Sequence, residues 1–531
     1  MKRIYRILLS VSSGILLSLA WLGFPGWTLF FAFLPLLYLD YFFVEQKKNY
    51  RSVSFFGHAF FSVLIWNVLT TFWVANATLT GALMAFVINS FVMSLVLWLG
   101  HISRRKFKPN LGYFSLIVFW ISLEYIHYHW DIEWPWLHLG NGFANNVKMV
   151  QWYEFTGVFG GTLWVLVMNI LLFKIGRNIL LKTAIKKSIY PISLFVVLLI
   201  VPLSISFPMY FSYVEKENPK NITIIQPNID PYSEEYGIAA DNIKLDKLLK
   251  LAKNKTDNVT DFVVAPETVF EERRYWNENN LEVNHQYKKL VSFVQNYSKA
   301  ELVFGVASSK IYPNKKSASE TARVQGDLIY DVFNAAFFID RNGKNQIYHK
   351  SKLVVGVEKM PFMKYLGFLG DIVINIGGTT GSYGRQKEAS NFVSKDGTRV
   401  APVICYESIF GEYVTGYVKK GAELIFIITN DGWWKNTPGY KQHMSFARLR
   451  AIETRRSIAR AANTGISCFI NQRGDVYQPT GWWVDAAIKG TINANDKITF
   501  YVKYGDFIGR ISLFVSVLLL LNLTVMRFVK N

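Results

Sequence analysis

The stretch Ala401–Phe410, APVICYESIF, governs how the rest of this chain is interpreted. Its short apolar residues predict the end of a buried strand, and the polar residues after Cys405 predict that the strand stops there. A thiol at the tip of a strand is a place where an enzyme holds a nucleophile. The alternative is a small buried hydrophobic side chain, which is what most free cysteines are. The remainder of the chain has to distinguish these two interpretations.

Composition indicates a membrane protein with a water-exposed domain. The 531 residues are 51% hydrophobic and 16% aromatic, yet they carry a formal net charge of +20. That is too apolar for an ordinary soluble protein and too charged for a pure helical bundle. Many lysines and arginines form short clusters between apolar runs, where they set membrane topology, so we expect no nucleic-acid partner.

The two cysteines, Cys405 and Cys468, exclude a disulfide framework and a thiolate metal cluster. Cys468 lies in GISCFIN, which predicts an interior strand. The 8 histidines are scattered along the chain, and His349 and His443 are interpreted as structural. We therefore expect no metal ion and no other cofactor.

About eight apolar segments are long enough to span a bilayer. They are residues 7–22, 27–44, 54–75, 81–100, 112–129, 157–174, 189–209 and 508–527. The N-terminus resembles a signal peptide, but we predict a retained helix because no small-residue cleavage site follows it.

The loop charges predict the orientation of these segments. Basic clusters precede the first span and follow the second, fourth, sixth and eighth, whereas the loops after the first and third spans carry no lysine or arginine. The positive-inside rule then places both termini in the cytoplasm. We expect a bundle over 1–214, an extracytoplasmic domain over 215–505 and a last span within 506–531.

The outer domain alternates strands with helices, which predicts an α/β fold with layered sheets. A hairpin is expected with its turn at Asn342-Gly343. Helices are expected at 240–256, 283–299 and 441–461, and the strands SCFINQ and DVYQPT are expected to close the domain.

Three predicted strands end on reactive residues, Glu267, Lys350 and Cys405. Each is unremarkable alone, and Lys352 competes with Lys350. Together they supply a base for the thiol, an ammonium for a thiolate or oxyanion, and a nucleophile. The backbone N–H of Tyr406 is a further candidate donor to the oxyanion.

Several motifs carry a family resemblance: APET, YHK, ICYES and TNDGWW in the outer domain, with WPWLHLGN and YEFTGVFGG in the bundle. With them the chain resembles the apolipoprotein N-acyltransferases, membrane-embedded members of the nitrilase superfamily. The resemblance implies an α-β-β-α sandwich with Glu267 as general base, Lys350 as oxyanion stabiliser and Cys405 as nucleophile. Glu358, Tyr406 and Glu407 match residues that support this triad.

The resemblance also implies the partners and the location. An acyl chain would pass from a membrane phospholipid, through a cysteine thioester, to the N-terminal amine of a diacylglyceryl-cysteine lipoprotein at the bacterial inner membrane, with a periplasmic catalytic domain in a monomer. Candidate substrate-binding residues are Trp134, Trp136, Tyr236, Phe362, Trp433 and Trp434. The family's tryptophan after QPNI is absent, and tyrosines Tyr232 and Tyr236 stand in that loop.

Some alternatives stay open at this point. The WPW segment is either an interfacial anchor or a lipid-binding surface, and the apolar loop 353–378 is either a membrane-touching lid or part of the core. The arginines of 441–461 form a solvated, ion-paired or headgroup-binding face. Functional rivals are a membrane-tethered amidase or nitrilase acting on small C–N bonds, and a transporter or scaffold with an inert domain. Transport is disfavoured because the spans lack buried charged pairs at mid-membrane.

Overall fold

The computed structural model describes residues 1–182, 186–232, 238–268, 275–362 and 382–528. The chain forms two compact units. The helical unit comprises residues 1–75, 79–213 and 504–531, and the α/β unit comprises residues 76–78 and 214–503.

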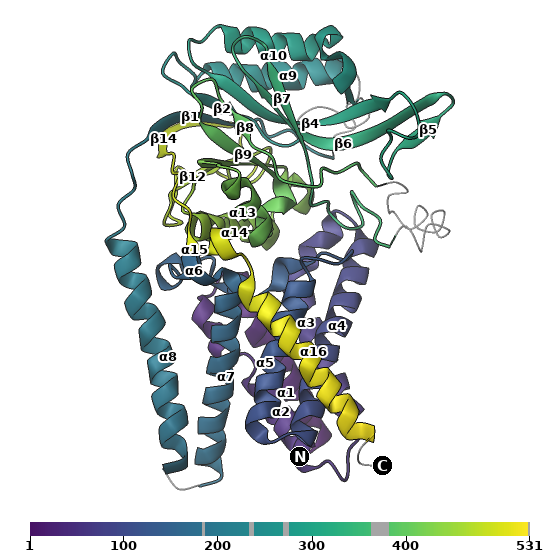
Figure 1. Cartoon of the computed structure of the whole chain (residues 1–531), viewed down its shortest axis with the longest axis vertical. Coiled ribbons are helices and arrows are strands. Elements are labelled where there is room, and N and C mark those ends of the chain that lie inside the picture. The colour runs from purple at the N-terminus through teal and green to yellow at the C-terminus, as the bar shows by residue number, and fades with distance from the viewer. Residues whose placement is uncertain (183–185, 233–237, 269–274, 363–381, 529–531) are drawn as a thin grey trace. The chain divides into compact units, whose positions relative to one another are not determined.

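The helical unit consists of long apolar helices joined by short turns and 3-10 segments (Figure 1). Its α-helices are α1 (Arg3–Ser18), α2 (Leu34–Glu45), α3 (Val53–Thr71), α4 (Leu79–Lys106), α5 (Pro109–Ile126), α6 (Tyr153–Thr156), α7 (Val158–Leu180), α8 (Lys186–Phe211) and α16 (Phe507–Phe528). Its 3-10 segments are η1 (Leu19–Leu22), η2 (Gly26–Phe31), η3 (Phe72–Asn76), η4 (Pro135–Leu137), η5 (Leu139–Phe143) and η6 (Val147–Met149).

Seven helices in the described part of the chain are long and apolar enough to cross a membrane. The sequence predicted about eight, and the difference is the fifth segment. It folds as α5, whose 18 residues include asparagine, serine and glutamate side chains that dilute its apolar character. Even so, α5 packs within the unit, where Ser122 on α5 and Ser516 on α16 share a hydrogen bond of 2.8 Å.

Close helix packing explains the glycines that follow Glu154. A Cβ built on Gly161 would lie 1.8 Å from the Tyr153 hydroxyl, so no larger residue fits there without a shift. That hydroxyl donates to the Gly140 carbonyl over 2.9 Å, which fixes η5 against α6. Small residues thus let backbones approach, as is common between membrane helices.

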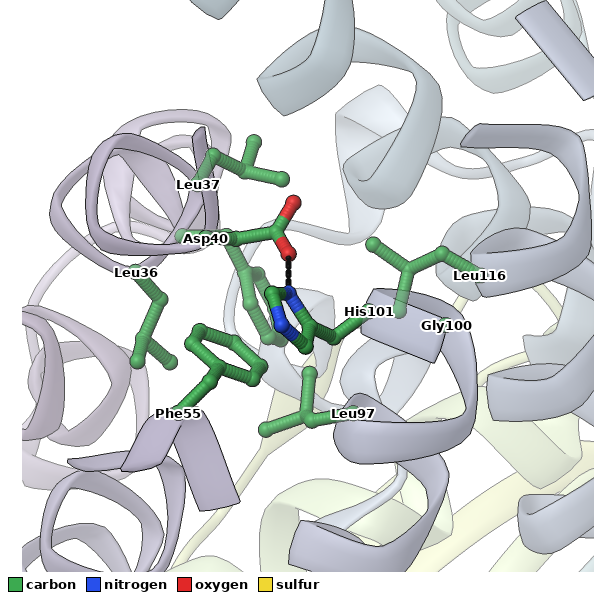
Figure 2. A pocket seen from close by; sticks show the side chains of 9 residues that line it. Leu36, Leu37, Asp40, Phe55, Leu97, Gly100, His101 and Leu116 are labelled. Carbon is green, nitrogen blue, oxygen red and sulfur yellow. Dashed lines mark hydrogen bonds and ion pairs between the residues drawn. The ribbon is translucent and has the colours of Figure 1, made fainter. Parts of the chain in front are cut away.

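A buried charged cluster in the helical unit was not predicted from the sequence. The Asp40 carboxylate lies 2.5 Å from His101 Nδ1 (Figure 2). The same carboxylate also accepts a hydrogen bond from Arg104. Arg104 belongs to the last turn of α4, so the cluster lies near a helix end and away from mid-span. Asp40 and His101 are 61 positions apart along the chain, which explains why the pattern of either span alone did not reveal the pair.

The α/β unit contains two mixed sheets, ordered β14-β1-β2-β4-β6-β5 and β13-β12-β11-β10-β9-β8, with β3 beside β4 and β7 beside β6. The strands of the first sheet are β1 (Pro219–Gln226), β2 (Phe262–Val264), β3 (Trp276–Asn277), β4 (Glu301–Tyr312), β5 (Arg323–Gln325), β6 (Leu328–Ile339), β7 (Asn345–His349) and β14 (Ala486–Asn493). Those of the second are β8 (Phe392–Val393), β9 (Arg399–Ile404), β10 (Leu424–Thr429), β11 (Ser457–Ala462), β12 (Cys468–Ile470) and β13 (Val476–Tyr477).

The helices of this unit cover the outer faces of the sheets, so the layers run α-β-β-α as expected (Figure 1). They are α9 (Ile238–Lys253), α10 (His285–Gln295), α13 (Gly411–Lys419), α14 (Pro438–Thr454) and α15 (Phe500–Tyr504), with 3-10 segments η7 (Glu278–Val283), η9 (Cys405–Ile409) and η10 (Asp431–Trp434).

Alternation along the strands builds the layers. On β1, Ile224 belongs to the core between the two sheets, whereas its neighbour Ile225 belongs to the core under α9 and α10. Val264 and Val263 on β2 divide in the same way. A strand buried on both faces has an apolar side chain at every position, which is why these strands read as continuous hydrophobic runs.

The predicted helix 441–461 is wrong at its C-terminal end. The helix α14 stops at Thr454, Arg455 takes a left-handed φ of 51°, and the next residues form β11. The run SIARAA is short enough to be either a helix turn or a buried strand, and its pairing with β10 and β12 decides for the strand. Strand β14, which pairs with β1, was also missed.

Four of the five arginines of this region belong to neither a solvated face nor a headgroup-binding face, and only Arg448 is partly exposed. Arg450, Arg455, Arg456 and Arg460 are fully buried. Arg450 pairs with Glu453 over 2.8 Å, and Arg456 donates to the Ala422 carbonyl over 2.7 Å. Buried guanidinium groups are tolerated where carboxylates and carbonyls accept hydrogen bonds from them, as they do here.

Candidate active site

The candidate site forms where parallel strands end. In the second sheet β9, β10 and β11 run parallel, so their carboxyl ends fall at the same edge. Cys405 follows β9 directly and Asp431 comes two residues after β10. In the first sheet Glu267 comes three residues after β2. Topology therefore gathers residues that are far apart in the sequence.

Cys405 sits in a strained turn. Its φ is 48°, a left-handed value that residues other than glycine rarely adopt. Its backbone carbonyl accepts a hydrogen bond from Ser408 Oγ over 2.8 Å, and His443 Nε2 lies 3.1 Å from the same oxygen. Left-handed non-glycine residues persist where their surroundings hold them, and they concentrate at functional sites.

Glu267, Lys350 and Glu358 form a buried cluster. Lys350 Nζ donates to Glu267 Oε1 over 3.1 Å and to Glu358 Oε1 over 2.9 Å. Asn334 Nδ2 donates to the same two oxygens over 2.7 and 2.8 Å. The two carboxylates are therefore bridged twice, once by an ammonium and once by an amide.

The remaining carboxylate oxygens anchor the backbone. Glu267 Oε2 accepts from the Asn430 amide over 3.1 Å, and Glu358 Oε2 accepts from the Val354 amide over 2.8 Å. The second contact closes the turn from Val354 to Glu358 in the segment LVVGVE. Charge-assisted hydrogen bonds of this kind fix carboxylate orientation strongly.

The backbone of Glu267 runs very close to β4. A Cβ built on Gly305 would lie 2.6 Å from the Cα of Glu267, so glycine is required at this position. The Gly305 amide donates to the Pro266 carbonyl over 3.0 Å and continues the pairing of β2 with β4 beyond the end of β2. Gly305 in the segment ELVFGVAS thus allows the backbone of Glu267 to approach β4 closely.

Burial and charge determine the protonation states. Burial raises the pKa of the Cys405 thiol well above its ordinary value, and Glu267 raises it further, although Lys350 and the Thr429 hydroxyl act in the opposite direction. Burial alone would lower the pKa of Lys350, but Glu267, Glu358 and Cys405 together hold it well above the usual range. The site at neutral pH therefore holds a protonated thiol beside a permanent ammonium.

Glu407 links the end of β7, which Lys350 follows, to the end of β9, which Cys405 follows. Its Oε1 accepts from the Tyr348 hydroxyl over 2.6 Å and from the Ser351 amide over 2.7 Å. Its Oε2 accepts from the Ile404 amide over 2.9 Å. Burial raises the pKa of this carboxyl group. Its contacts fix Lys350 and Cys405, which flank these amides, relative to each other.

Lys350 rather than Lys352 meets the carboxylates. Lys352 places its ammonium 4.9 Å from the centre of the Phe410 ring. Tyr406 is buried, and its ring lies 5.3 Å from that of Phe410. This packing fixes the turn in which the Tyr406 backbone N–H directly follows Cys405. Phe362 is partly buried with a left-handed φ of 54°.

The other predicted binding residues are spread over both units. Trp434 packs on His443 with 5.4 Å between ring centres, and Trp433 packs on Tyr232 at the same distance. Trp134 and Trp136 stack at 6.2 Å inside the helical unit, where Trp136 is buried. Tyr236 and most of the loop 353–378 lie outside the described residues, so their predicted roles stay predictions.

Sequence reasoning missed two groups of side chains around the site. Asn334 was passed over because asparagine in a hairpin strand has no distinctive spacing. Asp431 and Arg460 were not linked to His443, since they come from η10, β11 and α14. The signal present in the sequence was the set of polar residues directly after buried apolar strands, TND after ELIFII above all.

The arrangement can perform nucleophilic acyl chemistry. It offers a thiol, a carboxylate base and fixed positive charge for a developing oxyanion. In the described part of the chain, no group of three or more histidine, cysteine, aspartate or glutamate side chains is placed to hold a metal ion.

These features place the α/β unit in the carbon-nitrogen hydrolase class, whose family model matches residues 222–498. The model for the apolipoprotein N-acyltransferase N-terminal domain matches residues 13–171. The chain therefore belongs to the carbon-nitrogen hydrolase family and, within it, to the apolipoprotein N-acyltransferases.

Full-length relatives support this placement. The chain is 27% identical to an apolipoprotein N-acyltransferase of Chlorobaculum tepidum, over 96% of this chain and 94% of that one. It is 26% identical to that of Geobacter metallireducens, over 94% and 91%, and 25% identical to that of Thermotoga maritima, over 96% and 92%. Among solved structures it is similar to Saccharomyces cerevisiae Nit3, a nitrilase-superfamily member, with 15% identity and a TM-score of 0.38 over 53% of this chain and 93% of that one.

Proposed function

We propose that this chain transfers an acyl chain from a membrane phospholipid, through a thioester on Cys405, to the N-terminal amine of a diacylglyceryl-cysteine lipoprotein. The observation that carries the proposal is the meeting of Glu267, Lys350 and Cys405 at the ends of three strands, in a chain that also bears the N-terminal domain of the acyltransferase family. Both substrates are lipids, which explains why the α/β unit is joined to apolar helices.

In the first half-reaction Cys405 attacks the ester carbonyl of the phospholipid while Glu267 accepts the thiol proton. Because the thiol has a raised pKa, it requires this base at neutral pH. Lys350 and the Tyr406 amide stabilise the tetrahedral oxyanion. The carbon–oxygen bond then breaks, Glu267 returns the proton to the leaving lysophospholipid, and the thioester remains.

In the second half-reaction the α-amine of the lipoprotein attacks the thioester carbonyl. Glu267 takes a proton from the amine, the carbon–sulfur bond breaks, and the protonated Glu267 returns a proton to the sulfur. The net charge of the buried site is unchanged at each step, because one negative charge passes between Glu267, the oxyanion of the tetrahedral intermediate and the sulfur, all beside the Lys350 ammonium. Glu358 and Asn334 keep Glu267 in place throughout.

The membrane topology follows from the loop charges. If α5 crosses the bilayer together with the seven strongly apolar helices, all the basic clusters lie on the cytoplasmic side and the α/β unit lies outside the bacterial inner membrane. In Figure 1 the start of α1 and the end of α16 lie at the same end of the helical unit, which agrees with eight crossings. We expect a monomer that needs no cofactor.

A two-substrate assay tests the proposal. Purified chain is incubated with phosphatidylethanolamine labelled on its acyl chains and with a diacylglyceryl-cysteine peptide. We expect label on the peptide with the natural chain and none with Cys405→Ala or Cys405→Ser. Turnover of small amides without acyl transfer would instead support the tethered amidase, and full complementation of depleted cells by Cys405→Ser would support a scaffold.

A further inference from the structure

A second cluster of buried charged residues contacts the backbone of Cys405 and takes no part in the proposed acyl transfer. It consists of Asp431, His443 and Arg460, all of which are buried. Arg460 donates to Asp431 Oδ2 over 2.8 Å, and Asp431 Oδ1 lies 2.9 Å from His443 Nδ1. At its other end His443 Nε2 lies 3.1 Å from the backbone carbonyl oxygen of Cys405.

His443 connects the Asp431–Arg460 ion pair to the carbonyl of Cys405. Its Nδ1 faces both members of the ion pair, because Arg460 Nη2 lies 3.1 Å from the same nitrogen. The Cys405 carbonyl is an acceptor only, so its contact with the ring requires an N–H on Nε2. Burial alone would raise the pKa of Asp431, but Arg460 and His443 outweigh burial and keep it lowered.

Ser408 completes the support of the carbonyl. Its hydroxyl donates to the Cys405 carbonyl over 2.8 Å and lies 3.0 Å from His443 Nε2. The Trp434 ring packs edge-on against the imidazole, with 5.4 Å between ring centres. The oxygen therefore receives two donors from two different elements, η9 and α14.

This oxygen belongs to the residue with the strained backbone. The left-handed φ of 48° at Cys405 aims both its thiol and the following amide of Tyr406. A conformation that costs on the order of 1–3 kcal/mol persists only when neighbouring groups over-determine it. Hydrogen bonds to the carbonyl of the strained residue itself are the most direct way to hold its backbone conformation.

We propose that Asp431, His443 and Arg460 form a positioning chain that fixes the turn at Cys405 through its backbone carbonyl and so sets the rate at which the thiol is acylated. The inference rests on the proposed function, because it needs Cys405 to be the acylated nucleophile. His443 acts through the backbone of Cys405 and touches no substrate.

The test compares His443→Leu, which removes both ring nitrogens, with His443→Gln, whose amide restores one donor toward the carbonyl. Each full-length chain is mixed with acyl-labelled phosphatidylethanolamine at several concentrations, and the acyl adduct is timed by intact mass spectrometry. The matched control is Leu449→Ala, a fully buried change on the same helix α14 that removes packing without touching the chain of charges. Thermal unfolding of every variant separates lost stability from lost rate.

We expect His443→Leu to slow acylation at saturating donor by roughly 10- to 100-fold with a nearly unchanged KM, since misplacing a reacting group costs that much. His443→Gln should recover most of the rate, and Leu449→Ala should lose stability but keep its rate per folded chain. If His443→Leu does not fold, His443→Asn replaces it, because the shorter amide does not reach the carbonyl.

A His443→Leu chain that is acylated within about 2-fold of the natural chain would overturn the inference, as would a His443→Gln chain no faster than His443→Leu. Failure of the proposed function looks different. In that case the natural chain itself forms no adduct on Cys405, and the inference falls with it.

Discussion

The two units each bury an aspartate, a histidine and an arginine, and the two clusters differ in what the histidine reaches. In the α/β unit His443 contacts Asp431 through Nδ1 and the Cys405 carbonyl through Nε2. In the helical unit His101 contacts Asp40 through Nδ1, but its buried Nε2 has no hydrogen-bond partner among the described residues (Figure 2).

The surroundings of His101 indicate a structural role. Phe55 stacks on its ring at 4.8 Å, and the remaining lining side chains are mostly leucine and phenylalanine around a cavity of about 10 Å³. A space of that size holds one water molecule at most. The same three residue types therefore join helices α2 and α4 in one unit and support the proposed nucleophile in the other. Residue type alone does not identify a functional site. What distinguishes these two clusters is the partner of the histidine Nε2, which is the Cys405 carbonyl in one unit and no described group in the other.

The largest effect on rate is expected from Glu267→Gln, which removes the base from the reactive cluster. Acyl-enzyme formation should fall by roughly 10²- to 10⁴-fold, the range typical of a lost general base. Glu301→Gln is the matched control, because Glu301 is another buried carboxyl group of the α/β unit whose pKa burial raises to about 7. Single-turnover acylation measures both. Equal losses in the two variants would show that burying a carboxylate, rather than its place beside the thiol, is what matters.

Asp40→Leu should affect stability rather than rate. It leaves Arg104 and His101 buried without their carboxylate, which typically costs about 3–5 kcal/mol of unfolding free energy. Acylation per folded chain should stay unchanged. The triple replacement Asp40→Leu, His101→Leu, Arg104→Met should regain much of the stability, because it removes every buried charge of the cluster. Thermal unfolding and single-turnover assays separate the two quantities, and a rate loss at full folding would contradict the structural role.

Asn334→Ala should reduce the acylation rate by roughly 10- to 100-fold. The variant loses the amide that bridges Glu267 and Glu358, while Lys350 still pairs with both. Asn334→Asp should be slower still, since a third carboxylate would repel the other two. The order natural chain, Asn334→Ala, Asn334→Asp is the expected result, and an Asn334→Asp chain as fast as the natural one would rule out the bridge.

The thiol should react faster as pH rises. Because its pKa is raised well above the ordinary value, the thiolate fraction grows about tenfold per pH unit through the neutral range. Alkylation of Cys405 by iodoacetamide, followed by peptide mass spectrometry, should show this slope between pH 7 and 9. A plateau already reached at pH 7 would mean that Lys350 holds a preformed thiolate instead.

The smallest effect is expected at the other cysteine. Cys468 is fully buried in β12, and burial raises its pKa to about 12, so it stays an inert thiol. Cys468→Ala should retain the acylation rate and lose on the order of 1 kcal/mol of stability. Retained label in this variant also confirms that Cys405 carries the acyl group.

Local patterns predicted most of the fold. Alternation and apolar runs located β1, β2, β9 and β10, and the Asn342-Gly343 turn located the hairpin of β6 and β7. The prediction failed where two readings of one short run were equally good, as in SIARAA, and where a strand such as β14 gains its stability from pairing with a distant partner.

The candidate site shows the same division. Reactive residues at strand ends identified Glu267, Lys350 and Cys405, because each stands directly after an apolar run. Asn334, Asp431 and Arg460 gain their importance only from contacts across 12 to 67 positions of the chain, which no local pattern reports. Glu358 was predicted from the family resemblance alone. The structure gives the physical reason, because Glu358 and Glu267 both accept hydrogen bonds from Lys350.

The most direct test of the account is the mass of the intact chain after incubation with a phospholipid in the absence of an acceptor. The account predicts a gain equal to one acyl group on Cys405, removable by neutral hydroxylamine and lost from the protein when a diacylglyceryl-cysteine peptide is added. Acyl transfer to the peptide from a chain that never carries this adduct would contradict it.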